Sequence, residues 1–369
     1  MFAAFKPNGN TIRLVFFGRP ANDEEYLQHL QLISREVGGQ FGDQPPVFSY
    51  IAQPPLAGAQ LAMEVVEIMP ENGTTIQYRK RRDVPYIIAE SRTCKKLYLS
   101  GLQADSLKMT IREQADDIFS RLEDILYHEN MPISSIVRQW NYIEQIVKEV
   151  DGYQHYQEFN DSRTLFYNKT SWHNGYPAAT GVGTSCGGVV VDLDAMQSNG
   201  SDIEVVALNN HLQVAAHAYS PNVLVGKEDG QLGRKTTPKF ERAKLIHCGN
   251  KGVIYVSGTA AIRGEMSLYE VGIEEQTKIT LENIEHLLSK EKLENARISD
   301  GTCSRLSSVR VYLKEARFYE PAKKIIEEHY PGLPAVYLMA DVCRDELLVE
   351  IEGFALLDFR TSEPEKQEI

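Results

Sequence analysis

An internal repeat constrains the fold of this chain more than any other feature of its sequence. Five segments of the first half have counterparts in the second half, in the same order along the chain. The matched pairs are 97–101 with 254–258, 114–126 with 276–288, 134–138 with 307–310, 176–178 with 333–335, and 203–207 with 349–353. Such a repeat predicts a duplicated supersecondary unit, and the cleft between two copies is a natural ligand site.

Length and composition narrow the function classes. The chain has 369 residues, enough for two domains with a core each. The formal net charge of −12 comes with no basic stripe, which argues against nucleic acid as a partner. No window approaches the ~18 consecutive apolar residues of a membrane helix, and the N-terminus lacks the pattern of a signal peptide.

Cysteine and histidine usage indicates no metal centre. The five cysteines form no CxxC pair, and the nine histidines form no cluster with metal-ligand spacing. An odd number of scattered thiols suits a reducing compartment, so we expect a cytoplasmic protein.

Each copy reads as strand, helix, strand, helix, strand, strand. This order predicts an α+β fold of two modules, each a mixed sheet with helices on one face. We expect an N-terminal module over 1–210, a C-terminal module over 211–357 and a charged tail over 358–369. Helices are expected over 105–129, 275–288 and 315–330, and a strand over 212–219. The first ~90 residues show little helical periodicity, and 151–168 is rich in aromatic and polar residues without a clear period.

The sharpest local signal is a pair of glutamates in the last apolar strand. Glu350 and Glu352 are two residues apart, so they share one face of a strand. Carboxylates among apolar neighbours are costly unless that face lines a pocket or is salt-bridged at a surface, and both interpretations stay open. The first copy is expected to place Glu204 at the position of Glu350, and Val206 at that of Glu352.

Four further residues are candidates for a site. Arg163 lies among aromatics and could grip a carboxylate, or it could pair with a nearby acid. Arg263 follows a strand, where it could bind ligand or be an exposed loop arginine. Tyr219 ends an expected strand and could line a cleft or be structural. Cys343 precedes Glu350 by seven residues, and a single thiol is weak evidence for a nucleophile.

The residues at 256–258, 276–277, 281–284, 334–335 and 349–352 resemble the RidA (YjgF) family, whose fold is chorismate-mutase-like. Two such modules, with 159–163 and 175–184 between the repeat elements, resemble the chorismatases across most of the chain. These enzymes split chorismate into pyruvate and a cyclohexadiene or hydroxybenzoate product. RidA-type modules usually assemble in threes with pockets between neighbours, so a monomer or a small homo-oligomer is expected.

The resemblance to chorismatases implies a mechanism. Glu350 matches the family's acid, which protonates the methylene carbon of the enolpyruvyl ether of chorismate. Arg163, Tyr219 and Arg263 are the expected anchors for the substrate carboxylates, and no metal or cofactor is required. Members that form 3-hydroxybenzoate have a cysteine seven residues before the acid, as Cys343 is here.

The resemblance therefore predicts 3-hydroxybenzoate as the product, with 4-hydroxybenzoate as a possible second product. The alternatives are a chorismatase that makes the dihydroxycyclohexadiene carboxylate, an imine deaminase of the RidA type, and a non-catalytic metabolite-binding module. Ordinary RidA proteins hold an arginine just after the Pro-Ala that matches Pro334-Ala335. Here Val336 and Tyr337 follow, which counts against imine chemistry.

Overall fold

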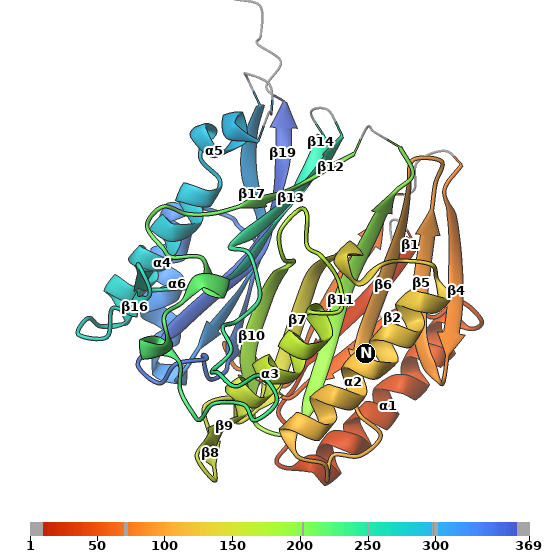
Figure 1. The fold of residues 1–369 in the computed structure, drawn as a ribbon, viewed down its shortest axis with the longest axis horizontal. Helices are drawn as coiled ribbons and strands as arrows, with labels where there is room; N and C mark the ends of the chain where they lie inside the picture. Colours follow the sequence, from red (N-terminus) through yellow and green to blue (C-terminus); the bar gives the residue numbers. More distant parts are fainter. Residues whose placement is uncertain are drawn as a thin grey trace, which may run out of the picture.

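The computed structural model describes residues 10–69, 73–200, 203–248, 251–296, 298 and 302–359. Two six-stranded sheets and one three-stranded sheet form the body of the molecule, and the longer helices lie on the outside of these sheets (Figure 1). The predicted α+β class with two repeated modules is confirmed. Of the predicted charged tail, residues 360–369 lie outside the described part of the chain.

Module 1 is the first six-stranded sheet with its two helices. Its strand order is β10-β7-β11-β6-β5-β4, and α2 and α3 connect β6 to β7 and β7 to β10. The bounds are β4 Thr75–Arg81, β5 Val84–Glu90, β6 Cys94–Leu102, α2 Ile111–His128, β7 Ile136–Glu144, α3 His155–Tyr167, β10 Ala178–Thr184 and β11 Val189–Ser198.

Module 2 repeats this topology. Its strand order, β12-β13-β14-β19-β17-β18, is that of module 1 read from the opposite edge, with α4 and α6 in the places of α2 and α3. The bounds are β12 Glu204–Leu208, β13 Ala243–Cys248, β14 Lys251–Ala260, α4 Ile273–Leu287, β17 Thr302–Leu313, α6 Tyr319–His329, β18 Ala335–Met339 and β19 Val349–Phe359.

Residues 10–68 add a third unit, which the sequence did not reveal. This N-terminal unit comprises β1 Asn10–Phe17, α1 Asp23–Phe41, β2 Val47–Ile51 and β3 Ala62–Ile68. Its β1 pairs with β2 in parallel and with β3 antiparallel, as β7 pairs with β10 and β11. The N-terminal unit is therefore a half-module with the topology of β7-α3-β10-β11, and it occupies the third position beside the two modules.

The three sheets meet in a shared core. One cluster of buried side chains takes members from every unit, among them Phe17, Tyr142 and Tyr312 from the central strands β1, β7 and β17. The helices cover the opposite faces of the two six-stranded sheets, where α2 and α4 bury their apolar sides. The inner faces thus point toward one another, and polar side chains on them are enclosed between units.

Two of the longer helices were missed by sequence reasoning, each for a physical reason. In α1, Asn22 caps the first turn, but the exposed Leu27 and Leu32 blur the periodicity of its buried face. In α3, the buried positions are largely polar and include Asn160 and Arg163, so no apolar stripe marks the helix.

Three other expectations need correction. The boundary at residue 210 is misplaced, because β12 pairs with β13 in the sheet of module 2. The expected strand over 212–219 is a loop with a short 3-10 turn at Ala216–Ala218. Glu204 is not the counterpart of Glu350, because β12 opens module 2, whereas the strand of module 1 that corresponds to β19 is β11.

Strand register identifies the true counterparts. Next to the central strand of each unit, Val15 pairs with Glu64, Trp140 with Asp192, and Arg310 with Glu352. Each of these pairings lies at the same distance from a β-bulge in its strand pair. Glu64, Asp192 and Glu352 are therefore equivalent carboxylates of the three units.

The same register places Glu350 in context. Two residues before the equivalent carboxylate, the N-terminal unit has Ala62, module 1 has Val190 and module 2 has Glu350. Among these equivalent positions, only that of module 2 holds an ionisable side chain.

Candidate active site

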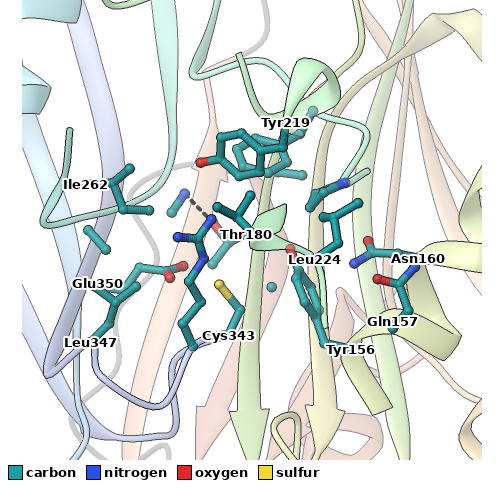
Figure 2. Close-up of a pocket in the computed structure, with 18 of the residues that line it drawn as sticks. Tyr156, Gln157, Asn160, Thr180, Tyr219, Leu224, Ile262, Cys343, Leu347 and Glu350 are labelled. Atoms are coloured by element: carbon teal, nitrogen blue, oxygen red, sulfur yellow. Dashed lines mark hydrogen bonds between the residues drawn. The ribbon is translucent and has the colours of Figure 1, made fainter. Parts of the chain in front are cut away.

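A pocket of about 790 Å³, including its open mouth, lies between module 1 and module 2. Strand β10 and helix α3 form one wall, and β14, β19 and the loop before β19 form the other (Figure 2). The loop between β12 and β13 covers the top. The lining residues are Gln154, Tyr156, Gln157, Asn160, Arg163, Ala179, Thr180, Gly181, Tyr219, Val223, Leu224, Val225, Pro238, Phe240, Arg242, Gly258, Ala260, Ile262, Cys343, Arg344, Leu347 and Glu350.

Glu350 is the one carboxylic acid among the described residues that line this pocket. Its side chain points from β19 toward the centre of the cavity (Figure 2) and takes no hydrogen bond from any described residue. Burial raises the pKa of Glu350 to about 8, with a further contribution from the negative charge of Glu352, while Arg242 and Arg138 act in the opposite direction. A proton therefore resides on Glu350 at neutral pH.

Glu352 is held in the opposite state. Its carboxylate, 2% exposed, accepts hydrogen bonds from Tyr312 (2.6 Å) and Arg310 (3.2 Å), and from Arg138 and Thr180 of module 1. Two arginines and two hydroxyl groups stabilise a buried anion here. The salt-bridged interpretation of the glutamate pair thus fits Glu352, and the pocket interpretation fits Glu350.

The pocket is cationic, although the whole chain is acidic. Arg163 reaches it from α3, bonded to Asn160, and its Nε lies buried without a partner among the described residues. Arg242 donates to the hydroxyl of Tyr219 (2.6 Å), and Arg344 stacks 5.2 Å from the centre of the Tyr219 ring. Three guanidinium groups thus line one cavity, which suits a substrate with more than one carboxylate.

The structure brings together four of the five candidates named from the sequence. Arg163, Tyr219, Cys343 and Glu350 all line the pocket. Arg263 does not, because its guanidinium pairs with Glu282 and Asn283 on helix α4. The loop-arginine interpretation applies to Arg263, and the position next to Tyr219 is filled by Arg242 instead.

Cys343 lies between the two walls, close to Glu350 (Figure 2). Burial raises the pKa of its thiol to about 12, and the neighbouring Glu350 adds to this effect. The thiol is therefore neutral at physiological pH and is no thiolate nucleophile.

Several lining residues escaped sequence reasoning. Tyr156, Gln157 and Asn160 belong to the unrecognised helix α3. Arg242 follows residues 221–240, a stretch rich in glycine and lysine that is typical of a surface loop. The cluster of aromatic residues around Arg163 is the signal that could have identified α3 as a wall of the site.

The described residues show neither a metal-binding cluster nor a membrane-spanning helix. No group of three or more histidine, cysteine, aspartate or glutamate side chains in this part of the chain could hold a metal ion. None of its helices is long and apolar enough to cross a membrane.

Comparisons with known proteins agree with this geometry. A family model described as chorismatase FkbO/Hyg5-like, N-terminal, matches residues 75–194. A 3-hydroxybenzoate synthase of Streptomyces hygroscopicus is 32% identical over 247 residues, which cover 65% of this chain and 67% of that protein. A chorismatase of the same organism is 24% identical over 222 residues, which cover 59% of this chain and 60% of that protein.

A solved structure shows the same fold over nearly the full length. The crystal structure of a chorismatase superimposes with a TM-score of 0.69 and 18% sequence identity, covering 95% of both chains. Together with the identity to the synthase, this shows that the chain belongs to the chorismatase family.

Proposed function

We propose that this protein cleaves chorismate to pyruvate and 3-hydroxybenzoate, with Glu350 as the general acid. The observation that carries the proposal is a buried glutamic acid that keeps its proton near pH 7 in a pocket lined by arginines. Proton transfer to carbon is slow, so an acid whose pKa lies near the working pH is a suitable donor.

The first step breaks the Glu350 O–H bond and forms a C–H bond at the terminal methylene carbon of the enolpyruvyl group. The oxocarbenium that results lies beside the new carboxylate of Glu350, which stabilises it electrostatically. Water then adds to the cationic carbon that bears the ether oxygen and returns a proton to Glu350, and the hemiketal collapses to pyruvate and the ring alcohol. Loss of the ring 4-hydroxyl with the C3 hydrogen as water gives 3-hydroxybenzoate, so the overall reaction consumes no water.

Substrate anchoring follows from the arginines. Chorismate carries two carboxylates, and Arg163 enters the pocket from α3 whereas Arg242 enters it from the loop before β13. Each has a buried Nε without a hydrogen-bond partner among the described residues. A carboxylate at either position would meet a donor that is already desolvated and oriented. The hydroxyl of Tyr219, which accepts a hydrogen bond from Arg242 at 2.6 Å, lines the same pocket.

The product assignment rests on Cys343. A neutral thiol in the middle of the pocket can limit where the ring lies and donate weakly to the departing 4-hydroxyl. The name 3-hydroxybenzoate synthase, borne by the 32% identical relative, supports this product.

We expect Cys343→Ala to keep pyruvate release within about tenfold while the dihydroxycyclohexadiene carboxylate replaces part of the 3-hydroxybenzoate. Chromatography of both reactions measures the ratio, and an unchanged ratio would remove Cys343 from the assignment.

The arrangement of units bears on assembly. The N-terminal unit fills the third position beside the two modules, so the three-sheet core is complete within one chain. This supports a monomer as the functional form.

The proposed reaction is tested by supplying chorismate and following pyruvate with lactate dehydrogenase and NADH. We expect turnover by the natural protein and a loss of about 10³-fold or more in Glu350→Gln, which keeps the shape but has no acidic proton. Isothermal titration should show chorismate binding to this variant with an affinity within a few-fold. Pyruvate release by Glu350→Gln at the natural rate would refute the acid, and binding of intact chorismate without pyruvate from the natural protein would indicate a metabolite-binding module.

The runner-up reaction, imine hydrolysis, has a separate assay with an imine derived from 2-aminoacrylate. Strand β10 forms the pocket wall, and there Pro177-Ala178 are followed by Ala179 rather than arginine. We therefore expect no ammonia release above the uncatalysed rate.

A further inference from the structure

The two glutamates of β19 share one face but have opposite surroundings. Four donors surround Glu352, whereas Glu350 has no hydrogen-bond donor among the described residues. Both side chains are buried, at 5% exposure for Glu350 and 2% for Glu352. A fixed negative charge therefore lies two residues from the acid, on the same face of the strand and with little solvent between them.

The hydrogen-bond donors that surround the carboxylate of Glu352 come from two modules. Arg310 and Tyr312 belong to the neighbouring strand β17 of module 2, whereas Arg138 and Thr180 reach across from β7 and β10 of module 1. Docking of the modules is thus what completes the shell around this carboxylate. Two guanidinium groups, those of Arg138 and Arg310, face this carboxylate and compensate its negative charge.

Thr180 also accepts a hydrogen bond from a backbone amide next to Glu350. The bulge of β14 leaves the amide of Gly258 outside the sheet ladder, and this N–H donates to Thr180 Oγ1 at 3.0 Å. A Cβ atom at Gly258 would overlap Oε1 of Glu350, so the carboxyl group lies against this residue. In module 1, the equivalent amide of Gly101 donates directly to the carboxylate of Asp192 (2.7 Å).

From this arrangement we propose that Glu352 is a positioning residue for the acid: its ionised carboxylate, held by Arg138, Thr180, Arg310 and Tyr312, keeps the proton on Glu350. The inference rests on the proposed role of Glu350 and goes beyond it. Two negative charges on neighbouring buried carboxyl groups repel each other. The ionised form of Glu352 therefore favours the protonated, neutral form of Glu350.

Other groups that face Glu350 belong to four further elements. Arg242 from the loop before β13 and Arg138 from β7 favour its ionised form. Cys343 from the loop before β19 and Tyr156 from α3 are neutral at physiological pH, because their own pKa values are raised by burial. Glu352 is thus the negatively charged neighbour that opposes the two arginines.

The test compares pH profiles of kcat/KM for three variants. The alkaline limb of each profile is the fall of kcat/KM with rising pH as Glu350 loses its proton. In Glu352→Gln the negative charge is removed, so this limb should move to lower pH by about one unit or more, and the rate at pH 9 should fall about tenfold. At acidic pH the rate should approach that of the natural enzyme. Glu352→Asp, which introduces the residue found at this position in module 1, keeps the charge and should keep the limb.

Asp192→Asn is the matched control, because Asp192 is the equivalent buried carboxylate of module 1 and has Val190 beside it instead of an acid. It should lower stability and leave the alkaline limb in place. A limb that stays in place in Glu352→Gln, with the rate lowered equally at every pH, would mean a purely structural role and overturn the proposal.

Two measurements guard against ambiguous outcomes. If Glu352→Gln does not fold, Tyr312→Phe removes one donor from Glu352 with little change of shape, and the limb should move up by a few tenths of a unit; no change or a downward shift overturns the proposal. Infrared difference spectra against Glu350→Gln follow the protonated carboxyl band of Glu350 without substrate. That titration reports the effect of Glu352 even if the protein releases no pyruvate, so the two proposals fail separately.

Discussion

Two equivalent clefts of this molecule differ, because one is an open pocket and the other is closed by packing. The cleft between module 1 and module 2 is open and holds Glu350, whereas the cleft between the N-terminal unit and module 1 is closed and holds Val190 in the shared core. In the closed cleft, Ser49 of β2 donates to Asp192 at 2.8 Å, as Thr180 of β10 donates to Glu352 in the open one. The interactions between carboxylate and hydroxyl are thus common to both clefts, and the acid is particular to one.

The way the backbones meet explains why one cleft is closed. The carbonyl oxygen of Phe48 in β2 lies against Gly101, so close that a Cβ on this glycine, whose φ is +68°, would overlap it. In the open cleft the equivalent Gly258 faces Glu350 and the pocket instead. The buried carboxylate at the position of Glu352 is thus common to both interfaces between units, whereas Glu350 and the space in front of it distinguish the open cleft.

The largest effect is expected at the closed cleft. Arg13 of β1 donates to Asp194 Oδ1 (2.6 Å), Ser100 Oγ (2.6 Å) and the carbonyl of Leu193 (2.9 Å) of module 1. Arg13→Met leaves Asp194 buried with its cation removed, which should lower the free energy of unfolding by about 3–5 kcal/mol. Chemical denaturation measures this loss.

The control for Arg13 is Arg317→Met, whose guanidinium is 71% exposed and pairs with Glu315. That change should stay within about 0.5 kcal/mol. Equal losses in both variants would mean that the N-terminal unit contributes nothing through its buried ion pair, and that the closed cleft is not a stabilising interface.

At the open cleft, the next effect concerns substrate binding. Arg242→Met should raise KM for chorismate about 10- to 100-fold, which corresponds to about 1.4–2.7 kcal/mol, because a buried charge-assisted contact is lost. Arg263→Met is the matched control, since that arginine pairs with Glu282 away from the pocket. Steady-state assays of pyruvate release distinguish the two; a larger effect at Arg263 would restore the prediction made from the sequence.

The smallest effect is a difference in stability with pH. Glu350 has a pKa of about 8 in the folded protein, above the ordinary value of 4.5, so the folded state holds a proton that the unfolded chain releases. This group's contribution to stability is full below about pH 4.5 and is lost as pH rises through 8. Glu350→Gln has no such loss, so its melting temperature should exceed that of the natural protein by an amount that grows from pH 5 to 8.

In free energy we expect this difference to reach about 1–2 kcal/mol. Thermal denaturation of both proteins across this range measures it, with Val190→Ala as a reference that should lower stability equally at every pH. A constant offset between Glu350→Gln and the natural protein would show that Glu350 is ionised when folded, and that the open cleft holds a salt-bridged carboxylate like the closed one.

The sequence by itself determined the features that depend on neighbours in the chain. The repeated segments predicted the two modules, and the alternation in β19 placed Glu350 and Glu352 on one face. The resemblance to chorismatases then selected Glu350 as the acid. The shared face of the two glutamates is confirmed, because side-chain direction in a strand follows from a period of two, whatever the strand packs against. The role of Glu350 as the acid stays a prediction.

Tertiary structure decided everything that depends on contacts between units. Arg138 lies 214 positions before Glu352 in the chain, and their contact settles which of the two glutamates is the paired anion. The half-module at the N-terminus was hidden because its helix α1 exposes leucines, and α3 was hidden because its buried face is polar. Arg263 was replaced by Arg242 because a loop of irregular backbone, which no periodicity describes, carries Arg242 into the pocket while Arg263 meets the acidic surface of α4.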